Sequence, residues 1–206
     1  MRIPVLRAAV VWTGLALCAA GAVAAEDAPV PVTSLRVFGG EAAGVGAELW
    51  CAQRLRVDLS AAALTLTSFD FASAGAVARL LGTPRQFLGL RGGYQIEYSG
   101  RSDGLWMGSR TAHSFDVGLV GRIESLRGSA LEAQMGVEKV YRPSAAACCD
   151  DAALPRFTTG LRASLLGELA IWDQLALFAY AELRTGAHVM ESYWLPIAAI
   201  GARYRF

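Results

Sequence analysis

Two histidines occur in this chain, and each stands near groups that could take part in acid–base or nucleophilic chemistry. His113 precedes Ser114, with Asp116 close behind, in the stretch TAHSFD. A nucleophilic serine needs an imidazole within hydrogen-bonding reach, and a carboxylate to orient that imidazole. Neighbouring residues of a β-strand point to opposite faces, so His113 and Ser114 cannot form such a pair by local geometry. A partner from another loop would have to complete the set.

The remaining candidates for chemistry are weaker. His188 precedes Glu191 and Ser192 in a segment that does not alternate between polar and apolar residues. The stretch CCDD, from Cys148 to Asp151, places two thiols beside two carboxylates. Vicinal cysteines span little space, and two cysteines alone do not build a tetrahedral metal site. We predict no enzymatic activity, no metal and no cofactor. The near-neutral charge and the lack of a basic run also indicate no nucleic-acid partner.

The elements that carry these residues alternate between polar and apolar positions, which is typical of β-strands with two different faces. In the final run, Arg203 and Arg205 share one face, whereas Tyr204 and Phe206 share the other. A membrane-spanning strand needs about 9–11 residues, and most of the runs are long enough. Eight such runs are expected, at residues 35–50, 53–66, 87–98, 114–126, 130–141, 157–172, 175–186 and 197–206.

The connections between these runs alternate between short and long. Short turns are expected at LRGS and DQ, and long loops at GRSDGLWMGSR, RPSAAACCDDAALPR and TGAHVMESYW. Short turns at one end and long loops at the other are the pattern of an outer-membrane barrel, with the short turns in the periplasm. An even strand count also puts both termini there. The stretch from Asp70 to Gln86 departs from the pattern, and we expect either a partly helical periplasmic connection or a misplaced strand boundary.

The apolar face is expected to point outward, toward lipid. It has almost no charge, and it has aromatic residues near strand ends, as in the girdles of membrane barrels. The polar face mixes charged with small residues, which suits the crowded inside of a narrow barrel. A soluble lipocalin-like barrel around one ligand, with the apolar face inward, is the alternative. The aromatic residues are Tyr94, Tyr98, Phe115, Tyr141, Phe157, Tyr204 and Phe206.

The polar face then predicts a network of charges in the lumen. Eight strands leave an interior just wide enough for side chains, and buried charges must pair because an unpaired one is very costly. We predict a plug of ion pairs and no open channel; a narrow ion path along the charges is the alternative. The predicted network comprises Glu48, Arg54, Arg56, Asp58, Arg91, Glu97, Asp116, Arg122, Glu124, Glu132, Glu138, Arg162, Glu168, Glu182, Arg184, Arg203 and Arg205.

The chain resembles the small eight-stranded outer-membrane β-barrel family, of the OmpA/OmpX type. The resemblance is one of pattern, and its one short motif is the final ARYRF. That motif looks like the C-terminal signal read by the barrel-assembly machinery, with Tyr204 and Phe206 as its apolar positions. The resemblance implies an all-β, antiparallel up-and-down transmembrane barrel in contact with outer-membrane lipid. Some barrels of this kind modify lipid A. The His-x-Ser spacing of the deacylases is absent here, so a lipid A enzyme is the alternative and not the main prediction.

Residues 1–25 are predicted to be a secretory signal peptide, because Arg2 and Arg7 precede a short apolar run and small residues near Ala24. Residues 26–206 then form one barrel domain in the outer membrane of a Gram-negative-type cell. Its role is expected to be structural, or to involve loop residues such as Trp106, Tyr193 and Trp194, although the sequence names no extracellular partner. Three cysteines remain, and a disulfide from Cys51 to Cys148 or Cys149 could join two outer loops.

Overall fold

The computed structural model describes residues 33–40, 42–52, 54–64, 69–101, 108–142, 157–185 and 194–206. The predicted signal peptide lies outside these ranges. The described residues form ten β-strands with the following bounds: β1 Thr33–Gly40, β2 Ala42–Ala52, β3 Leu55–Leu64, β4 Phe69–Gly82, β5 Gln86–Arg101, β6 Gly108–Glu124, β7 Ala130–Tyr141, β8 Phe157–Ala170, β9 Leu175–Thr185 and β10 Trp194–Arg205.

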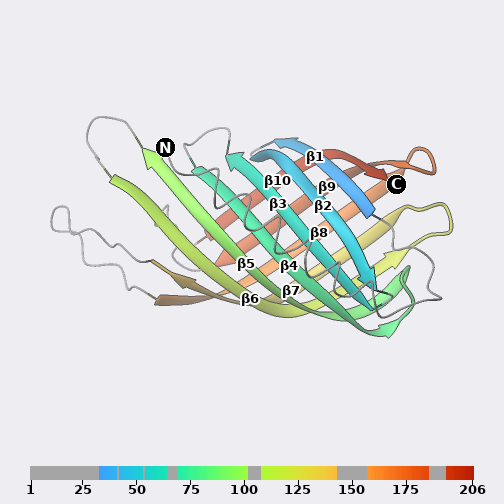
Figure 1. Ribbon diagram of the computed structural model, residues 1–206, viewed down its shortest axis with the longest axis horizontal. Helices are drawn as coiled ribbons and strands as arrows, with labels where there is room; N and C mark the ends of the chain where they lie inside the picture. Colours follow the sequence, from blue (N-terminus) through green and yellow to red (C-terminus); the bar gives the residue numbers. More distant parts are fainter. Residues whose placement is uncertain are drawn as a thin grey trace.

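The ten strands form one closed antiparallel barrel in which each strand pairs with its neighbours in sequence (Figure 1). The barrel closes where β1 pairs with β10, with Arg36 opposite Arg203 and Phe38 opposite Gly201. The Phe206 N–H donates to the carbonyl of Thr33 at 2.9 Å, which ties the two ends of the barrel sequence together. Closure leaves no strand edge unpaired. The predicted all-β, up-and-down antiparallel barrel is therefore confirmed.

The prediction of eight strands is wrong, because the sequence reading missed two of the ten. The run expected at 35–50 is a hairpin, β1 and β2, which turns at Gly40. Gly40 has a φ of 138°, a conformation that favours glycine and that allows the tight reversal.

The other missed strand is β4, which occupies the segment expected to be either a partly helical connection or a misplaced strand boundary. Alanine is so frequent in β4 that the segment looks helical. However, its residues point alternately into the lumen and outward, as in a strand. Phe71, Ser73 and Val77 face the lumen, while Ala76 and Ala78 are exposed outside. Pairing on both sides, with β3 and β5, overrides the helix preference of alanine.

The two ends of the barrel differ in their connections. We call one the turn end: β1 begins and β10 finishes there, and residues 83–85, 125–129 and 171–174 connect strands there. At the opposite loop end, residues 65–68, 102–107, 143–156 and 186–193 fall between strands, and β1 and β2 meet there in a short turn at Gly40 that was not expected. In Figure 1 the C-terminus lies at the turn end, beside the β8–β9 connection. No helix in the described part of the chain is long and apolar enough to cross a membrane.

The two faces of the strands are as different as the alternation predicts. On β9, Phe178, Glu182 and Arg184 are buried, while Leu177 and Leu183, at alternate positions, are exposed. The same contrast recurs around the barrel, because the lumen is filled by inward side chains. The larger exposed apolar residues on the strands include Leu35, Val37, Val45, Leu88, Leu90, Phe115, Val117, Leu119, Ile123, Leu131, Met135, Val137, Phe157, Leu161, Leu165, Leu169, Leu177, Leu183, Ile200 and Tyr204.

Candidate functional site

The charged side chains of the lumen form two clusters at different heights. The cluster nearer the turn end, called here the turn-end network, consists of Arg36, Glu48, Arg56, Asp58, Arg122, Glu124, Glu132, Glu168, Arg203 and Arg205. The cluster nearer the loop end, called the loop-end network, consists of Arg91, Glu97, Asp116, Glu138, Arg162, Glu182 and Arg184.

Glu168 is the centre of the turn-end network. Its side chain has no exposed surface, and its carboxylate lies 2.8 Å from Nη1 of Arg203 and 3.1 Å from Nη2 of Arg122. Arg36 and Arg205 contribute longer ion pairs, at 3.5 and 3.9 Å. These partners come from β1, β6 and β10, so one carboxylate on β8 connects opposite walls of the barrel.

A second carboxylate extends this network across the lumen. Glu132 accepts two hydrogen bonds from Arg56, at 2.6 and 2.8 Å, and one from Arg122 at 3.1 Å. The two bonds from Arg56 use the planar fork of the guanidinium, which matches a carboxylate in geometry. Arg56 also lies over the ring of Phe87, 5.8 Å from its centroid. Charge and aromatic packing therefore fix the same arginine.

Arg184 is the centre of the loop-end network and is fully buried. Its Nη1 donates to Glu97 at 2.6 Å, while Nε donates to Glu138 at 3.1 Å and Nη2 donates to the same carboxylate. Arg162 similarly bridges Asp116 at 2.8 Å and Glu182 at 3.0 Å. These bonds connect β5, β6, β7, β8 and β9 through two guanidinium groups.

A small cavity of about 150 Å³ lies between the two networks. Arg56 borders it from one network, and Arg91 and Arg162 border it from the other. The Nε atoms of these three arginines have no hydrogen-bond partner among the described residues. Phe38 and Phe178 supply apolar walls. Ten strands enclose a wider lumen than eight, and the cavity is the part of that width which the charged side chains leave open.

Most of the predicted lumen charges lie in these two networks, but Arg54 does not. Arg54 lies in the turn between β2 and β3, where its side chain is exposed, because the strand pairing shifts between Trp50 and Ala52. Two lumen arginines were missed. Arg36 was missed because β1 was merged with β2, although Gly39–Gly40 marks the turn between them. Arg142 is buried at the end of β7 and follows the phase of Glu138.

The candidate catalytic residues do not come together. His113 lies on the outer face, where its Nδ1 is 2.7 Å from the hydroxyl of Tyr94. Ser114 points into the lumen and accepts a hydrogen bond from Arg184 at 3.1 Å. Asp116 is bound by Arg162. His188, with Glu191 and Ser192, lies outside the described residues.

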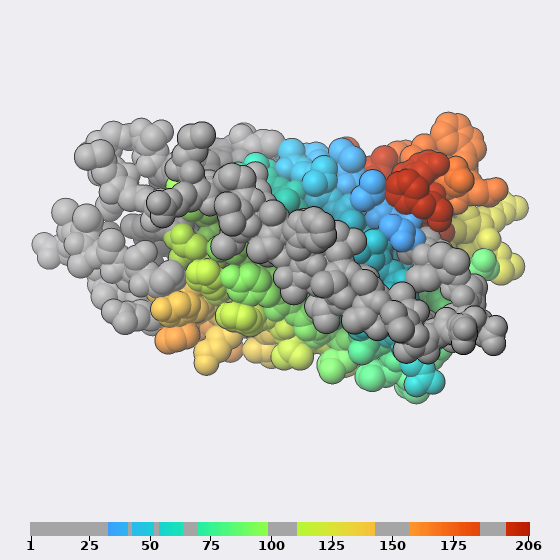
Figure 2. All heavy atoms as spheres, viewed as in Figure 1, coloured from blue at the N-terminus to red at the C-terminus, as the bar shows by residue number. Residues whose placement is uncertain are grey.

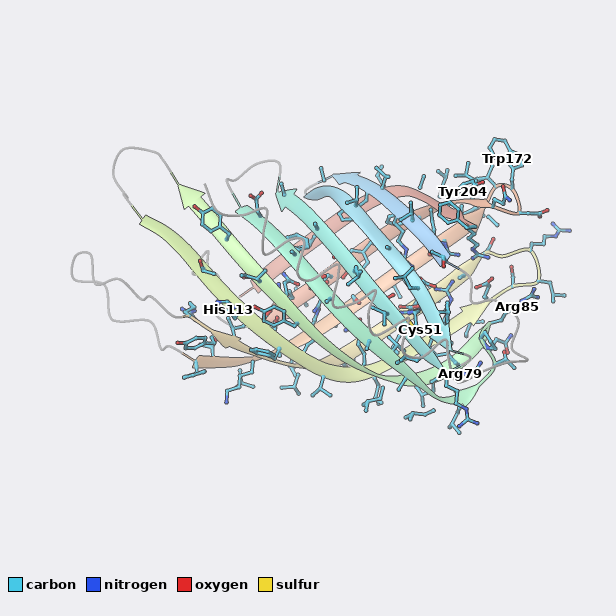
Figure 3. All side chains as sticks on the ribbon, viewed as in Figure 1. Cys51, Arg79, Arg85, His113, Trp172 and Tyr204 are labelled. Atoms are coloured by element: carbon cyan, nitrogen blue, oxygen red, sulfur yellow. The ribbon has the colours of Figure 1, made fainter. Side chains whose placement is uncertain are left out.

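Cys51 lies in β2 near the turn end, so its expected position in an outer loop is wrong (Figure 3). By contrast, β7 ends and β8 begins at the loop end of the barrel. Cys51 is disulfide-bonded. Cys148 and Cys149 also lie outside them, as do Trp106, Tyr193 and the side chain of Trp194. Within the described ranges, no group of three or more His, Cys, Asp or Glu side chains could hold a metal ion.

Comparison with known proteins adds little to this geometry. No family model matches the sequence, and no curated protein matches it. Among solved structures, the chain is similar to a bacterial polysaccharide outer membrane secretin, with 11% identity and a TM-score of 0.43. The match covers 85% of this chain and 63% of that one, so the chain spans less than two thirds of its structural neighbour. A likeness at this level carries no argument about function.

Proposed function

We propose that this chain is an integral β-barrel protein of the bacterial outer membrane, with a lumen plugged by ion pairs. Its role is structural, or is one of interaction through the segments at the loop end. The observation that carries the proposal is the direction of the two faces. Leucine, valine, isoleucine, methionine and phenylalanine side chains are exposed around the outside, while arginine and glutamate fill the inside. Water outside would favour the reverse arrangement, and lipid favours this one.

The length of β7 supports the same proposal. On β7 the outward face is apolar at Leu131, Met135 and Val137 and ends with Lys139 and Tyr141. Ten residue steps of about 3.3 Å, tilted by about 45°, correspond to roughly 23 Å. An outer-membrane barrel has an apolar band about 25 Å tall. The strand is therefore about as long as a crossing requires.

Aromatic side chains border this band at both ends. At the turn end, Tyr204 packs against Phe206 with ring centroids 5.1 Å apart, and Trp172 is 71% exposed in the β8–β9 turn (Figure 3). At the loop end, Tyr141 stacks on Phe157 at 4.8 Å. Such girdles fit the two interfaces of a membrane. In this proposal the turn end, with its short connections, faces the periplasm, and the loop end faces the outside.

The alternative of a soluble ligand-binding barrel is less well supported. Small-molecule pockets typically have volumes of about 300–1,000 Å³ and mostly apolar walls. The lumen cavity is about half the lower limit, and arginines from both networks border it. A ligand would have to replace ion pairs that now cross the barrel. We therefore favour the plug over a binding cavity.

The proposed partners follow from this location. Outer-membrane lipid would surround the apolar band, and the barrel-assembly machinery would recognise Tyr204 and Phe206 at the end of β10. The proposal includes no catalytic role. Analysis of lipid A from cells that express the wild type or the His113→Ala, His188→Ala double variant tests this: loss of an acyl modification in the variant alone would establish an enzyme.

Cell fractionation tests the location. The protein should stay in the membrane pellet after a carbonate wash, and it should migrate differently on a gel before and after boiling. Release by carbonate, together with unchanged mobility, would rule out an integral barrel.

Single-channel recording of the purified protein in a planar bilayer tests the plug. We expect no stable large conductance, because the ion pairs leave only a small cavity between them. A stable large conductance from the monomer would reject the plug while leaving the membrane barrel intact.

A further inference from the structure

A cluster of aromatic and basic side chains lies on the outer face near the loop end of β5–β8. It consists of Tyr94, His113, Lys139, Tyr141 and Phe157 and is called here the interfacial cluster. His113 pairs with Tyr141 across β6 and β7, and Tyr141 pairs with Phe157 across β7 and β8. Their rings form a continuous row, with centroids 6.2 and 4.8 Å apart. Figure 2 shows the loop-end parts of β6 and β8, yellow-green and light orange, close together on the surface.

Lys139 is unusual within this row because it is a cation on an apolar face. It is the sole lysine of the sequence, and it is exposed on the same side of β7 as Met135 and Val137. Its ammonium lies 5.4 Å from the ring centroid of Phe157, and it forms no ion pair with any described residue. A lysine costs several times less near the membrane interface than at the midplane, so this position suits the level of lipid headgroups.

His113 supplies a second donor beside this ammonium. Its Nδ1 is engaged by the Tyr94 hydroxyl at 2.7 Å, which leaves Nε2 for an external group. Nε2 carries a proton when the hydroxyl donates to Nδ1. His113 lies diagonally across from Lys139, because Tyr141 is opposite His113 and Lys139 is opposite Phe115. Diagonal positions of paired strands are about 7–8 Å apart. The flexible four-carbon stem of Lys139 lets its ammonium move off Phe157 toward a phosphate that His113 also contacts.

We propose that the interfacial cluster binds the phosphate of a phosphorylated outer-leaflet lipid, through Lys139 and His113. This inference rests on the proposed location in the outer membrane. A lipid is favoured over a free anion because the two donors face sideways from the barrel, directly above the apolar band. The rings of Tyr141 and Phe157 would then pack against the part of the lipid that joins its headgroup to its chains.

Binding of diphosphoryl lipid A to the purified barrel in zwitterionic lipid nanodiscs tests the proposal, with bound lipid counted by native mass spectrometry. Lys139→Gln removes the positive charge that would face the phosphate, and His113→Asn replaces the imidazole by a shorter amide that lacks Nε2. Each should weaken retention by about tenfold, since each weakens a hydrogen bond to a charged group. Arg127→Gln is the matched control, because it removes an exposed positive charge from the turn end and should leave retention unchanged. Dephosphorylated lipid A should bind the wild type as weakly as diphosphoryl lipid A binds the variants.

Equal retention by the wild type and Lys139→Gln, or by phosphorylated and dephosphorylated lipid A, would overturn the site. Displacement of the lipid by millimolar inorganic phosphate would also overturn it, because it would indicate a site for the free anion. The gel mobility shift on boiling is measured for each variant to verify folding. If the shift and the carbonate-resistant pellet persist while lipid selectivity is absent, the site is wrong and the barrel proposal stands. If the wild type itself shows neither the mobility shift on boiling nor the carbonate-resistant pellet, both the lipid site and the membrane barrel are rejected.

Discussion

Replacing Glu168 with glutamine should strongly destabilise the barrel while preserving the size of the side chain. The carboxylate is fully buried between Arg122 and Arg203, at 3.1 and 2.8 Å, with two more arginines within 4 Å. Glutamine removes the negative charge and offers one acceptor oxygen where there were two. The change therefore leaves several buried cations with less compensating charge.

The expected loss is about 3 kcal/mol in the free energy of unfolding. Removing one partner of a buried ion pair typically costs about 3–5 kcal/mol, because an uncompensated charge stays in the interior. The lower end applies here because Arg122 still contacts Glu124 and Glu132, and Arg203 still lies 3.9 Å from Glu48. These neighbours take over part of the compensation.

Urea unfolding in lipid vesicles measures this loss, with the folded fraction read from unboiled gels. Glu124→Gln is the control: Glu124 also contacts two arginines, but its side chain is 13% exposed, so water should limit its loss to about 1 kcal/mol. If Glu168→Gln stayed within about 0.5 kcal/mol of the wild type, a range typical of surface substitutions, the reasoning from a buried, shared carboxylate would be refuted.

Three further predictions concern the barrel wall. Met135→Arg should destabilise the protein in vesicles by about 2–4 kcal/mol, because position 135 faces the middle of the apolar band, whereas Met135→Leu should change stability little; equal behaviour of both variants would contradict a lipid-facing β7. Gly201→Val should cost about 1–3 kcal/mol in the same assay, since a Cβ there would lie 2.1 Å from a backbone carbonyl; Gly121, with nothing within 4 Å, is the control that should tolerate valine. Phe206→Ala should reduce the amount of folded protein recovered from outer membranes while leaving the refolded protein stable. Normal recovery of the variant would contradict the prediction that Phe206 is part of a C-terminal assembly signal.

The sequence alone was enough to predict the strand faces, because alternation is a local property. Arg203 and Tyr204 could be assigned to opposite sides without knowing any neighbour. The same parity placed Glu97, Arg162 and Glu182 in the lumen, where the structure has them. The turn and loop ends also followed, since connection lengths can be counted directly.

Strand number required the tertiary structure, because it depends on pairing. β4 reads as helix by its alanines and becomes a strand only between β3 and β5. The hairpin at Gly40 likewise follows from closure of β1 on β10. Position along a strand has the same dependence. The shifted pairing after Trp50 moves Arg54 out of the lumen, and the reversal of the chain between β1 and β2 brings Cys51 back to the turn end.

The ion pairs themselves were decided entirely by the folded barrel. Local spacing shows that an arginine faces inward, but not which acid lies across the lumen. Glu97 and Arg184 are 87 residues apart in sequence and 2.6 Å apart in space. The inward charge of each strand is thus a property of the sequence, whereas the plug that these charges build exists only because ten strands close and bring opposite walls within reach.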